Sequence, residues 1–172
     1  MVSKKFSIPK GYEILNQTED HIANIGQGFY KRNEAGDLIM AFWVRPENGN
    51  SGGVAHGGML MSIADYCLCS VAMESKENYA ATISFRSEFV APAKVGSLVE
   101  IFTTITKETK SLAFGQGYIE CEGEIVFSFS GIVKKTVSYT HLRAHETPEH
   151  RVWRGGLEKK KGGGGGGGGG GG

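Results

Sequence analysis

The sequence is poor in several features that mark specialised classes of protein. Its 172 residues include only three cysteines, four prolines and two tryptophans. Cys67, Cys69 and Cys121 all lie in apolar stretches, and an odd number of cysteines does not suit a disulfide framework. We therefore expect reduced thiols and a cytoplasmic protein. The first residues lack the apolar stretch of a secretory signal, so no signal peptide is predicted.

A hydrophobic run suited to a membrane is also missing. The longest apolar window, residues 54–73, contains His56, a pair of glycines and Asp65 near its centre. A carboxylate near the middle of a bilayer costs about 2.5–3.5 kcal/mol on insertion scales. The window therefore predicts a buried helix of a water-soluble protein, with no membrane partner.

The C-terminal part lacks any pattern of regular structure. From Val137 onward the chain shows neither the alternation of a strand nor the period of a helix, and residues 162–172 are an unbroken glycine run. This segment resembles a translated sequencing adapter followed by a homopolymer artefact, so residues 137–172 are predicted to be a non-native, disordered tail. His141, His145 and His150 have the spacing of metal ligands but lie in this tail. No metal site is predicted.

The charge of the remaining chain excludes another class. The whole sequence has a net charge of +1, but residues 1–136 carry 13 Lys and Arg against 15 Asp and Glu, a net charge of −2. The basic surface that nucleic-acid binding requires is therefore missing, and no nucleic-acid partner is predicted. About 135 residues suit one domain. We divide them into a lead-in, residues 1–21, and a single domain, residues 22–136.

What the sequence does contain is a series of strand patterns around one helical stretch. Strands are predicted at residues 22–32, 38–45, 79–91, 97–107, 112–120 and 124–133, with a helix at residues 56–75. The strand at 38–45 is apolar on both faces, which predicts burial on both sides. The helix is apolar around nearly its whole circumference, which also predicts burial. The order predicts an α+β fold in which one antiparallel sheet wraps around one long central helix.

The strand at residues 79–91 shows the clearest alternation. Its apolar face is predicted to carry Ile83, Phe85 and Phe89. The polar face is predicted to carry Thr82, Ser84, Arg86 and Glu88.

The junction between loop and helix holds the most unusual residues. Residues 50–58 read Asn-Ser-Gly-Gly-Val-Ala-His-Gly-Gly, and Asp65 is the only charged residue of the helix before Glu74. Turn and cap chemistry alone would explain the glycines, and His56 fits a helix cap as well as a reactive site. Asp65 fits either a structural, hydrogen-bonded carboxylate or a functional one. Because a buried unpaired charge is costly, the functional reading is preferred for Asp65.

The Asn-x6-Gly-x7-Asp frame, with His-Gly-Gly at the helix start, and the order of the elements resemble the hotdog-fold acyl-CoA thioesterases, above all the phenylacetate-pathway (PaaI-like) type. The resemblance covers about residues 20–136. It implies hydrolysis of acyl-CoA thioesters without a metal or redox cofactor, coenzyme A being part of the substrate. It also implies homodimers, usually paired into homotetramers, with active sites at the dimer interface.

The resemblance and the chemistry together define the predicted site. A helix N-terminus offers free N–H groups, and the glycines leave the N–H of Gly57 open as an oxyanion donor. Asp65 would activate water or attack the thioester itself. By resemblance, Asn50 orients the water or the carbonyl, and the Thr82 hydroxyl assists. The predicted catalytic residues are thus Asp65, Gly57, Asn50, His56 and Thr82. The predicted substrate-binding residues are Gly58, Met61, Ser84, Arg86 and Lys94, the last two near the phosphates of coenzyme A.

The spacing of the two central groups adds a condition. Gly57 and Asp65 are eight residues apart, which is about 12 Å along a helix. An attacking water must lie about 3 Å from its base. One helix therefore cannot supply both groups to one site, and Asp65 is predicted to meet the Gly57 of a second subunit across a two-fold axis.

Two other functions remain open. The first is a non-catalytic hotdog module that binds acyl-CoA or acyl chains, although such a module would not need a base. The second is a hotdog hydratase or dehydratase, although the spacing of histidine and acid does not match. The identity of the acyl group is also open.

Overall fold

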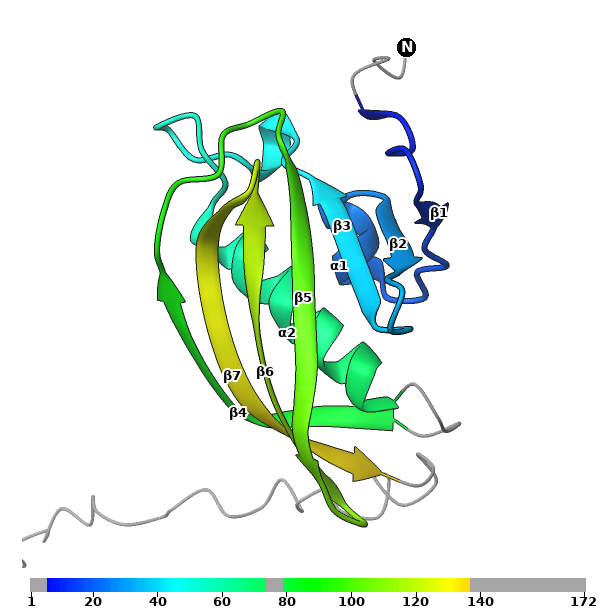
Figure 1. Cartoon of the computed structure of the whole chain (residues 1–172). Helices are drawn as coiled ribbons and strands as arrows, with labels where there is room; N and C mark the ends of the chain where they lie inside the picture. Colours follow the sequence, from blue (N-terminus) through cyan, green and yellow to red (C-terminus); the bar gives the residue numbers. More distant parts are fainter. Residues whose placement is uncertain (1–5, 74–78, 137–172) are drawn as a thin grey trace, which may run out of the picture. The chain divides into compact units, whose positions relative to one another are not determined.

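The computed structural model describes residues 6–73 and 79–136. These residues form an antiparallel sheet and one long helix (Figure 1). The helices are α1 (Asp20–Ile25) and α2 (Gly57–Met73), with a 3-10 turn at Pro46–Asn48. The strands are β1 (Glu13–Ile14), β2 (Gly28–Arg32), β3 (Leu38–Trp43), β4 (Tyr79–Phe89), β5 (Leu98–Glu108), β6 (Leu112–Cys121) and β7 (Glu124–Thr136). The predicted tail at residues 137–172 lies outside the described residues.

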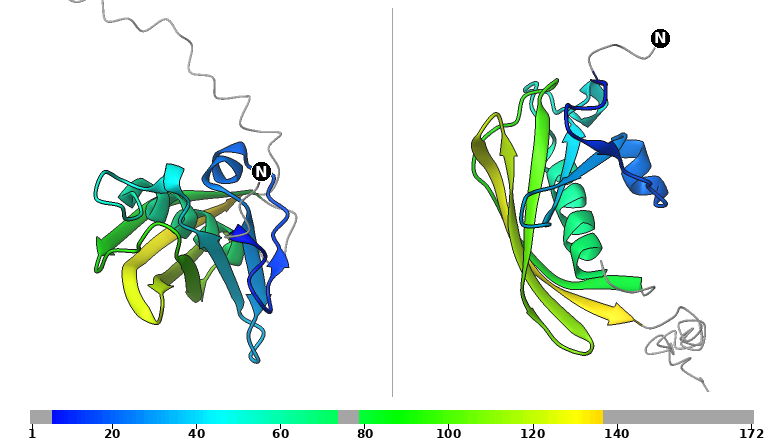
Figure 2. Two further views of the ribbon diagram at one scale, coloured as in Figure 1. Left: turned by 90° about the horizontal axis from the view of Figure 1, so that it is seen from above. Right: turned by 45° about the vertical axis from the view of Figure 1, so that its right-hand side comes forward.

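The sheet has the strand order β1-β2-β3-β5-β6-β7-β4, and all neighbours are antiparallel. It curves around α2, which lies against its concave side (Figure 2, right). The strand that follows α2 in the sequence, β4, pairs with β7 and lies at the edge of the sheet. The predicted α+β fold, one antiparallel sheet around one central helix, is confirmed.

The prediction of a strand at residues 22–32 is wrong for the first half of this range. Residues 20–25 form α1, and only Gly28–Arg32 is a strand. Ile22 and Ile25, three residues apart, share one helical face and are both buried. Gly26, with a φ of 146°, ends the helix in a conformation that favours glycine. A strand also occurs in the predicted lead-in, because β1 pairs with β2.

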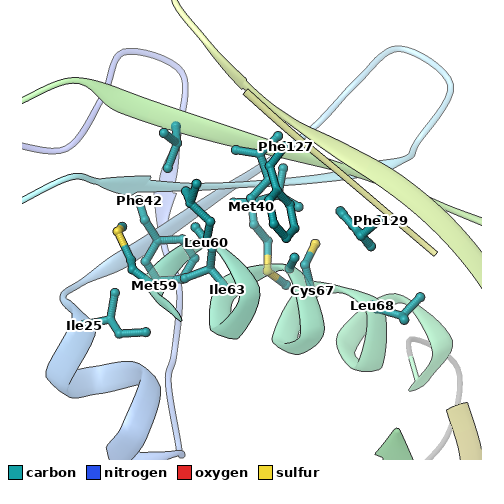
Figure 3. Close-up of a cluster of buried hydrophobic side chains, with 14 of the residues drawn as sticks. Ile25, Met40, Phe42, Met59, Leu60, Ile63, Cys67, Leu68, Phe127 and Phe129 are labelled. Atoms are coloured by element: carbon teal, nitrogen blue, oxygen red, sulfur yellow. The ribbon is translucent and has the colours of Figure 1, made fainter. Parts of the chain in front are cut away.

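The core lies between α2 and the concave face of the sheet (Figure 3). Ile63, Cys67 and Leu68 of α2 are fully buried, and Phe42 and Phe127 face them from the strands. Burial raises the pKa of the Cys67 thiol to about 12, as expected for a thiol in apolar surroundings.

The opposite side of α2 is less covered than its apolar sequence predicts. Met61 is 41% exposed, and Ser62, Asp65 and Tyr66 are half-buried. The prediction of burial on all sides is therefore wrong for the single chain. This side carries the polar residues of the helix, and α1 lies against only part of it.

A β-bulge in β4 changes which side chains face the helix. Thr82 pairs with Val133 and Ser84 with Ile132, so the strand has one extra residue at Ile83. Thr82 consequently points to α2, although Ser84 points away from it. The predicted common face for Thr82, Ser84 and Arg86 is wrong because strict alternation cannot reveal a bulge.

Candidate active site

The loop before α2 is held by its own hydrogen bonds. The Asn50 N–H donates to the Val54 carbonyl at 2.8 Å, and the Gly53 N–H donates to the Asn50 carbonyl at 3.1 Å. The side-chain oxygen of Asn50 accepts from the Gly52 N–H at 2.8 Å. Gly53 has a φ of 73°, which glycine adopts without strain. Asn50 is therefore exposed on an ordered turn, with its side-chain oxygen already bonded within the loop.

His56 caps the start of α2. Its Nδ1 accepts a hydrogen bond from the Gly58 N–H at 3.0 Å, and its carbonyl accepts from the Met59 N–H at 2.9 Å. Nδ1 is therefore the acceptor nitrogen of the ring, and Nε2 is the one that can donate. His56 thus acts as a helix cap, which is one of the two roles that the sequence left open. Because the Gly58 N–H donates to His56, it is not available to a ligand.

The N–H of Gly57 is the donor that the cap leaves open. Within the described part of the chain it has no acceptor, because it precedes the first helical hydrogen bond. A Cβ at Gly57 would lie 2.8 Å from Cε1 of Phe89, whose side chain is 58% exposed. Glycine at this position therefore leaves room for the Phe89 ring beside a free N–H at the positive end of the helix.

Asp65 lies two turns further along α2, in a hydrogen-bonded chain. The Thr82 hydroxyl donates to Oδ1 of Asp65 at 2.6 Å, and Cys69 Sγ lies 3.3 Å from the Thr82 oxygen. Since Thr82 has a single proton and a carboxylate only accepts, the thiol of Cys69 is the donor to Thr82. Burial raises the pKa of this thiol, which keeps it protonated.

The second oxygen of Asp65, Oδ2, has no hydrogen-bond donor among residues 6–73 and 79–136. Thr82 therefore orients the carboxylate and leaves one oxygen open. An open carboxylate oxygen can accept the proton of a water or bind a polar ligand.

Asp65 borders a pocket of about 430 Å³. Most of the other wall residues come from α2 or β4, and three come from the segment around α1. The wall consists of Asp65, Ser62, Tyr66, Cys69, Ala80, Thr82, Glu19, His21 and Ile22. A hydrogen bond of 3.0 Å between His21 Nε2 and Ser62 Oγ joins the two segments, and Ser62 donates to the Gly58 carbonyl at 2.9 Å.

Sequence reasoning missed Cys69, Glu19 and His21 as pocket residues. Cys69 could have been found, because it follows Asp65 by four residues and so lies on the same helical face. Glu19 and His21 could not have been found, because no helix was predicted in this segment and residues 22–32 were predicted to be a strand. Their place in the pocket depends on α1.

The other predicted binding residues lie apart from this pocket. Met61 is exposed on α2 but does not line it. Ser84 and Arg86 lie on the face of β4 turned away from Thr82, and Arg86 Nε lies 3.0 Å from a carboxylate oxygen of Glu88. Lys94 is exposed beside the loop, and its backbone forms an isolated antiparallel β-bridge with Val54.

Two further observations concern the described residues as a whole. No three of their His, Cys, Asp or Glu side chains gather into a potential metal site. Neither of their helices has the length and apolar character needed to cross a membrane.

The bond from Thr82 to Asp65 leads to a first prediction. Thr82→Val removes the donor and keeps the shape, so kcat for the reaction of this site should fall about 10-fold, as for a hydrogen bond to a charged group worth ~1.5 kcal/mol. Thr82→Ser keeps the hydroxyl and should stay near wild type. Steady-state kinetics of the three proteins checks this. Equal kcat for valine and serine would show that the hydroxyl has no role.

Comparison with known proteins adds to this geometry. The model of the thioesterase superfamily matches residues 52–127, which include Gly57, Asp65 and Thr82. Residues 52–127 of this chain are therefore similar to the thioesterase superfamily, and the fold is that of the hotdog proteins. A Pseudomonas aeruginosa protein named "putative esterase" is 27% identical over 128 residues, covering 73% of this chain and 96% of the relative.

Solved structures agree with this chain in fold. A mutant of the phenylacetic acid degradation protein PaaI from Thermus thermophilus has a TM-score of 0.59 and 23% identity, over 67% of this chain and 98% of that chain. A Bacillus halodurans protein solved with CoA has a TM-score of 0.62 and 18% identity, over 72% of this chain and 83% of that chain. At these identities the likeness concerns the fold.

Proposed function

We propose that this protein hydrolyses acyl-CoA thioesters to the free acid and coenzyme A. The observation that carries the proposal is the Asp65 carboxylate, held through one oxygen by Thr82 and open at the other. The free Gly57 N–H supplies the second requirement, a donor for the oxyanion. The match to the thioesterase superfamily supports thioester hydrolysis over other uses of these groups.

In the proposed reaction, a water lies on the open oxygen of Asp65 and gives it a proton while its oxygen attacks the thioester carbonyl carbon. The carbonyl oxygen becomes an oxyanion and accepts a hydrogen bond from the Gly57 N–H. The C–S bond then breaks, and the proton on Asp65 goes to the leaving thiolate of coenzyme A. In the alternative course, Asp65 attacks the carbonyl carbon and expels the thiolate, and water then cleaves the resulting anhydride at the aspartyl carbonyl. A single turnover in ¹⁸O-labelled water distinguishes the two courses: the first puts the label into the product acid, and the alternative puts it into Asp65 and leaves the acid unlabelled.

The two groups would come from two subunits. Both lie on α2, eight residues apart and so about 12 Å along the helix axis, which is too far for one carbonyl and its attacking water. Apolar side chains on and near the edge strand support a second copy there: Ile83 is 56% exposed, and Phe89 and Val90 are each 58% exposed. We propose a homodimer with two composite sites, paired into a homotetramer.

The remaining substrate contacts follow from charge and position. Lys94 beside the loop, and Arg86 on β4, are proposed to meet the phosphates of coenzyme A, with Met61 beside the acyl chain and Asn50 beside the thioester carbonyl. The Bacillus halodurans relative solved with CoA supports a CoA thioester as the substrate. The three cysteines, all free thiols, support a cytoplasmic location.

A panel of aliphatic and aromatic acyl-CoA thioesters, with released thiol detected colorimetrically, tests the proposal. We expect release well above the spontaneous rate for at least one member of the panel. Binding without thiol release would instead support a non-catalytic acyl-CoA module. Formation of a hydroxyacyl or enoyl product with the thioester intact would support a hydratase or dehydratase.

A further inference from the structure

The pocket beside Asp65 has a wall that the proposed reaction does not use. Glu19 and His21, from the segment around α1, face α2 across the pocket. Glu19 stands at the N-terminus of α1, but its side chain makes no cap hydrogen bond, and no ion pair with it is found among the described residues. Its carboxylate is therefore open to whatever enters the pocket.

The balance of charge in this pocket is negative. Its ionic side chains are the carboxylates of Glu19 and Asp65 and the imidazole of His21. Two carboxylates against one imidazole leave the site negative whether or not the imidazole is protonated. The charges act on neighbouring groups. Burial is the largest cause that raises the pKa of the Cys69 thiol, and the hydrogen bond with Thr82 lowers it, while Asp65 and Glu19 both raise it. Burial also raises the pKa of Tyr66, and Glu19 adds to this.

The position of the pocket decides which part of the substrate it receives. When the thioester carbonyl lies at Asp65, the substrate continues from it in two directions, as the acyl group on one side and as coenzyme A on the other. Coenzyme A carries several phosphate charges, which two carboxylates repel. The acyl arm is neutral in simple fatty or aromatic thioesters, so it is the arm that the pocket can hold.

We propose that Glu19 is a specificity-determining residue that excludes acyl groups ending in a carboxylate and admits acyl groups with a neutral or cationic end. This inference rests on the proposed thioesterase function and concerns the acyl end of that same site. The discrimination works by repulsion of the wrong substrate, which costs no contact with the right one.

The test uses six-carbon acyl groups that differ only at their end: hexanoyl, adipoyl and 6-aminohexanoyl. Hydrolysis of the three CoA thioesters is measured as kcat/KM. Binding of the corresponding thioethers, in which a methylene replaces the carbonyl, is measured by calorimetry. The full-length wild type is compared with Glu19→Gln, which removes the charge and keeps the shape, and with Glu19→Lys. Glu34→Gln, in the turn between β2 and β3 and outside the pocket wall, is the matched control.

Wild type should bind and hydrolyse the adipoyl compounds more weakly than the hexanoyl ones. Because Glu19 is exposed and its charge is screened by solvent, Glu19→Gln should reduce the ratio of hexanoyl to adipoyl kcat/KM only about 3- to 10-fold. Glu19→Lys should reduce it further and also weaken the 6-aminohexanoyl compounds, whereas Glu34→Gln should match wild type. High salt should lower the ratio of hexanoyl to adipoyl kcat/KM of the wild type, because it screens the repulsion.

Equal affinity of wild type for the hexanoyl and adipoyl thioethers would overturn the proposal, as would a ratio unchanged by Glu19→Gln. Absence of thiol release from every thioester is a different result, because it contradicts the proposed hydrolysis. In that case the thioether affinities still decide whether Glu19 selects the acyl end.

Discussion

Asp65→Asn should lower kcat for thioester hydrolysis by about 10²–10⁴-fold, the range expected when a general base is removed. Asparagine keeps the size of the side chain and an oxygen that can accept from Thr82. It loses the basicity of the open oxygen. KM should change much less than kcat, because the lost interaction belongs to the transition state. Thiol release from the best substrate of the panel measures both constants.

The control for this variant separates chemistry from folding. Thermal unfolding and size-exclusion chromatography should give the same melting temperature, within a few degrees, and the same oligomer as wild type. Glu34→Gln, an exposed carboxylate in the turn between β2 and β3, should keep full activity. Turnover by Asp65→Asn at the wild-type rate would remove Asp65 from the mechanism.

The second large effect concerns the Gly57 N–H. Gly57→Pro deletes this donor, and proline is well tolerated at the first position of a helix, where the N–H has no helical acceptor. Gly57→Ala keeps the N–H but adds the same Cβ, which meets the Phe89 ring. Proline should reduce kcat about 10²–10³-fold beyond the effect of alanine, as for loss of an oxyanion donor. Equal kcat for the two variants would exclude the Gly57 N–H as that donor.

The same variant tests whether the site is shared between subunits. A Gly57→Pro chain and an Asp65→Asn chain, carrying different tags, are co-expressed and purified through both tags. Each is inactive alone, but the mixed dimer contains one intact pair, the Asp65 of the first chain and the Gly57 of the second. We expect recovery of about a quarter to a half of wild-type activity. A mixed dimer as inactive as its parents would place both groups in one subunit.

Local patterns in the sequence predicted much of the fold. Long strand patterns and the apolar stretch from Gly57 to Met73 were recognisable because each element spans enough residues to show its period. The first helix was missed because α1 has only six residues, too few to separate a helical period from a strand. The bulge at Ile83 was missed because an extra residue appears only when β4 is aligned with β7.

The sequence by itself predicted that Gly57 and Asp65 share one helix and lie about 12 Å apart along its axis, since helical rise depends only on residue count, and the shared site is proposed from this spacing. Only the tertiary structure decided what surrounds them. Thr82 reaches Asp65 because of the bulge, His56 takes the Gly58 N–H and leaves that of Gly57 open, and Glu19 reaches the pocket through α1. These features are contacts between segments distant in the chain, or the outcome of competition between hydrogen bonds. The periodicity of a local sequence predicts neither kind of feature.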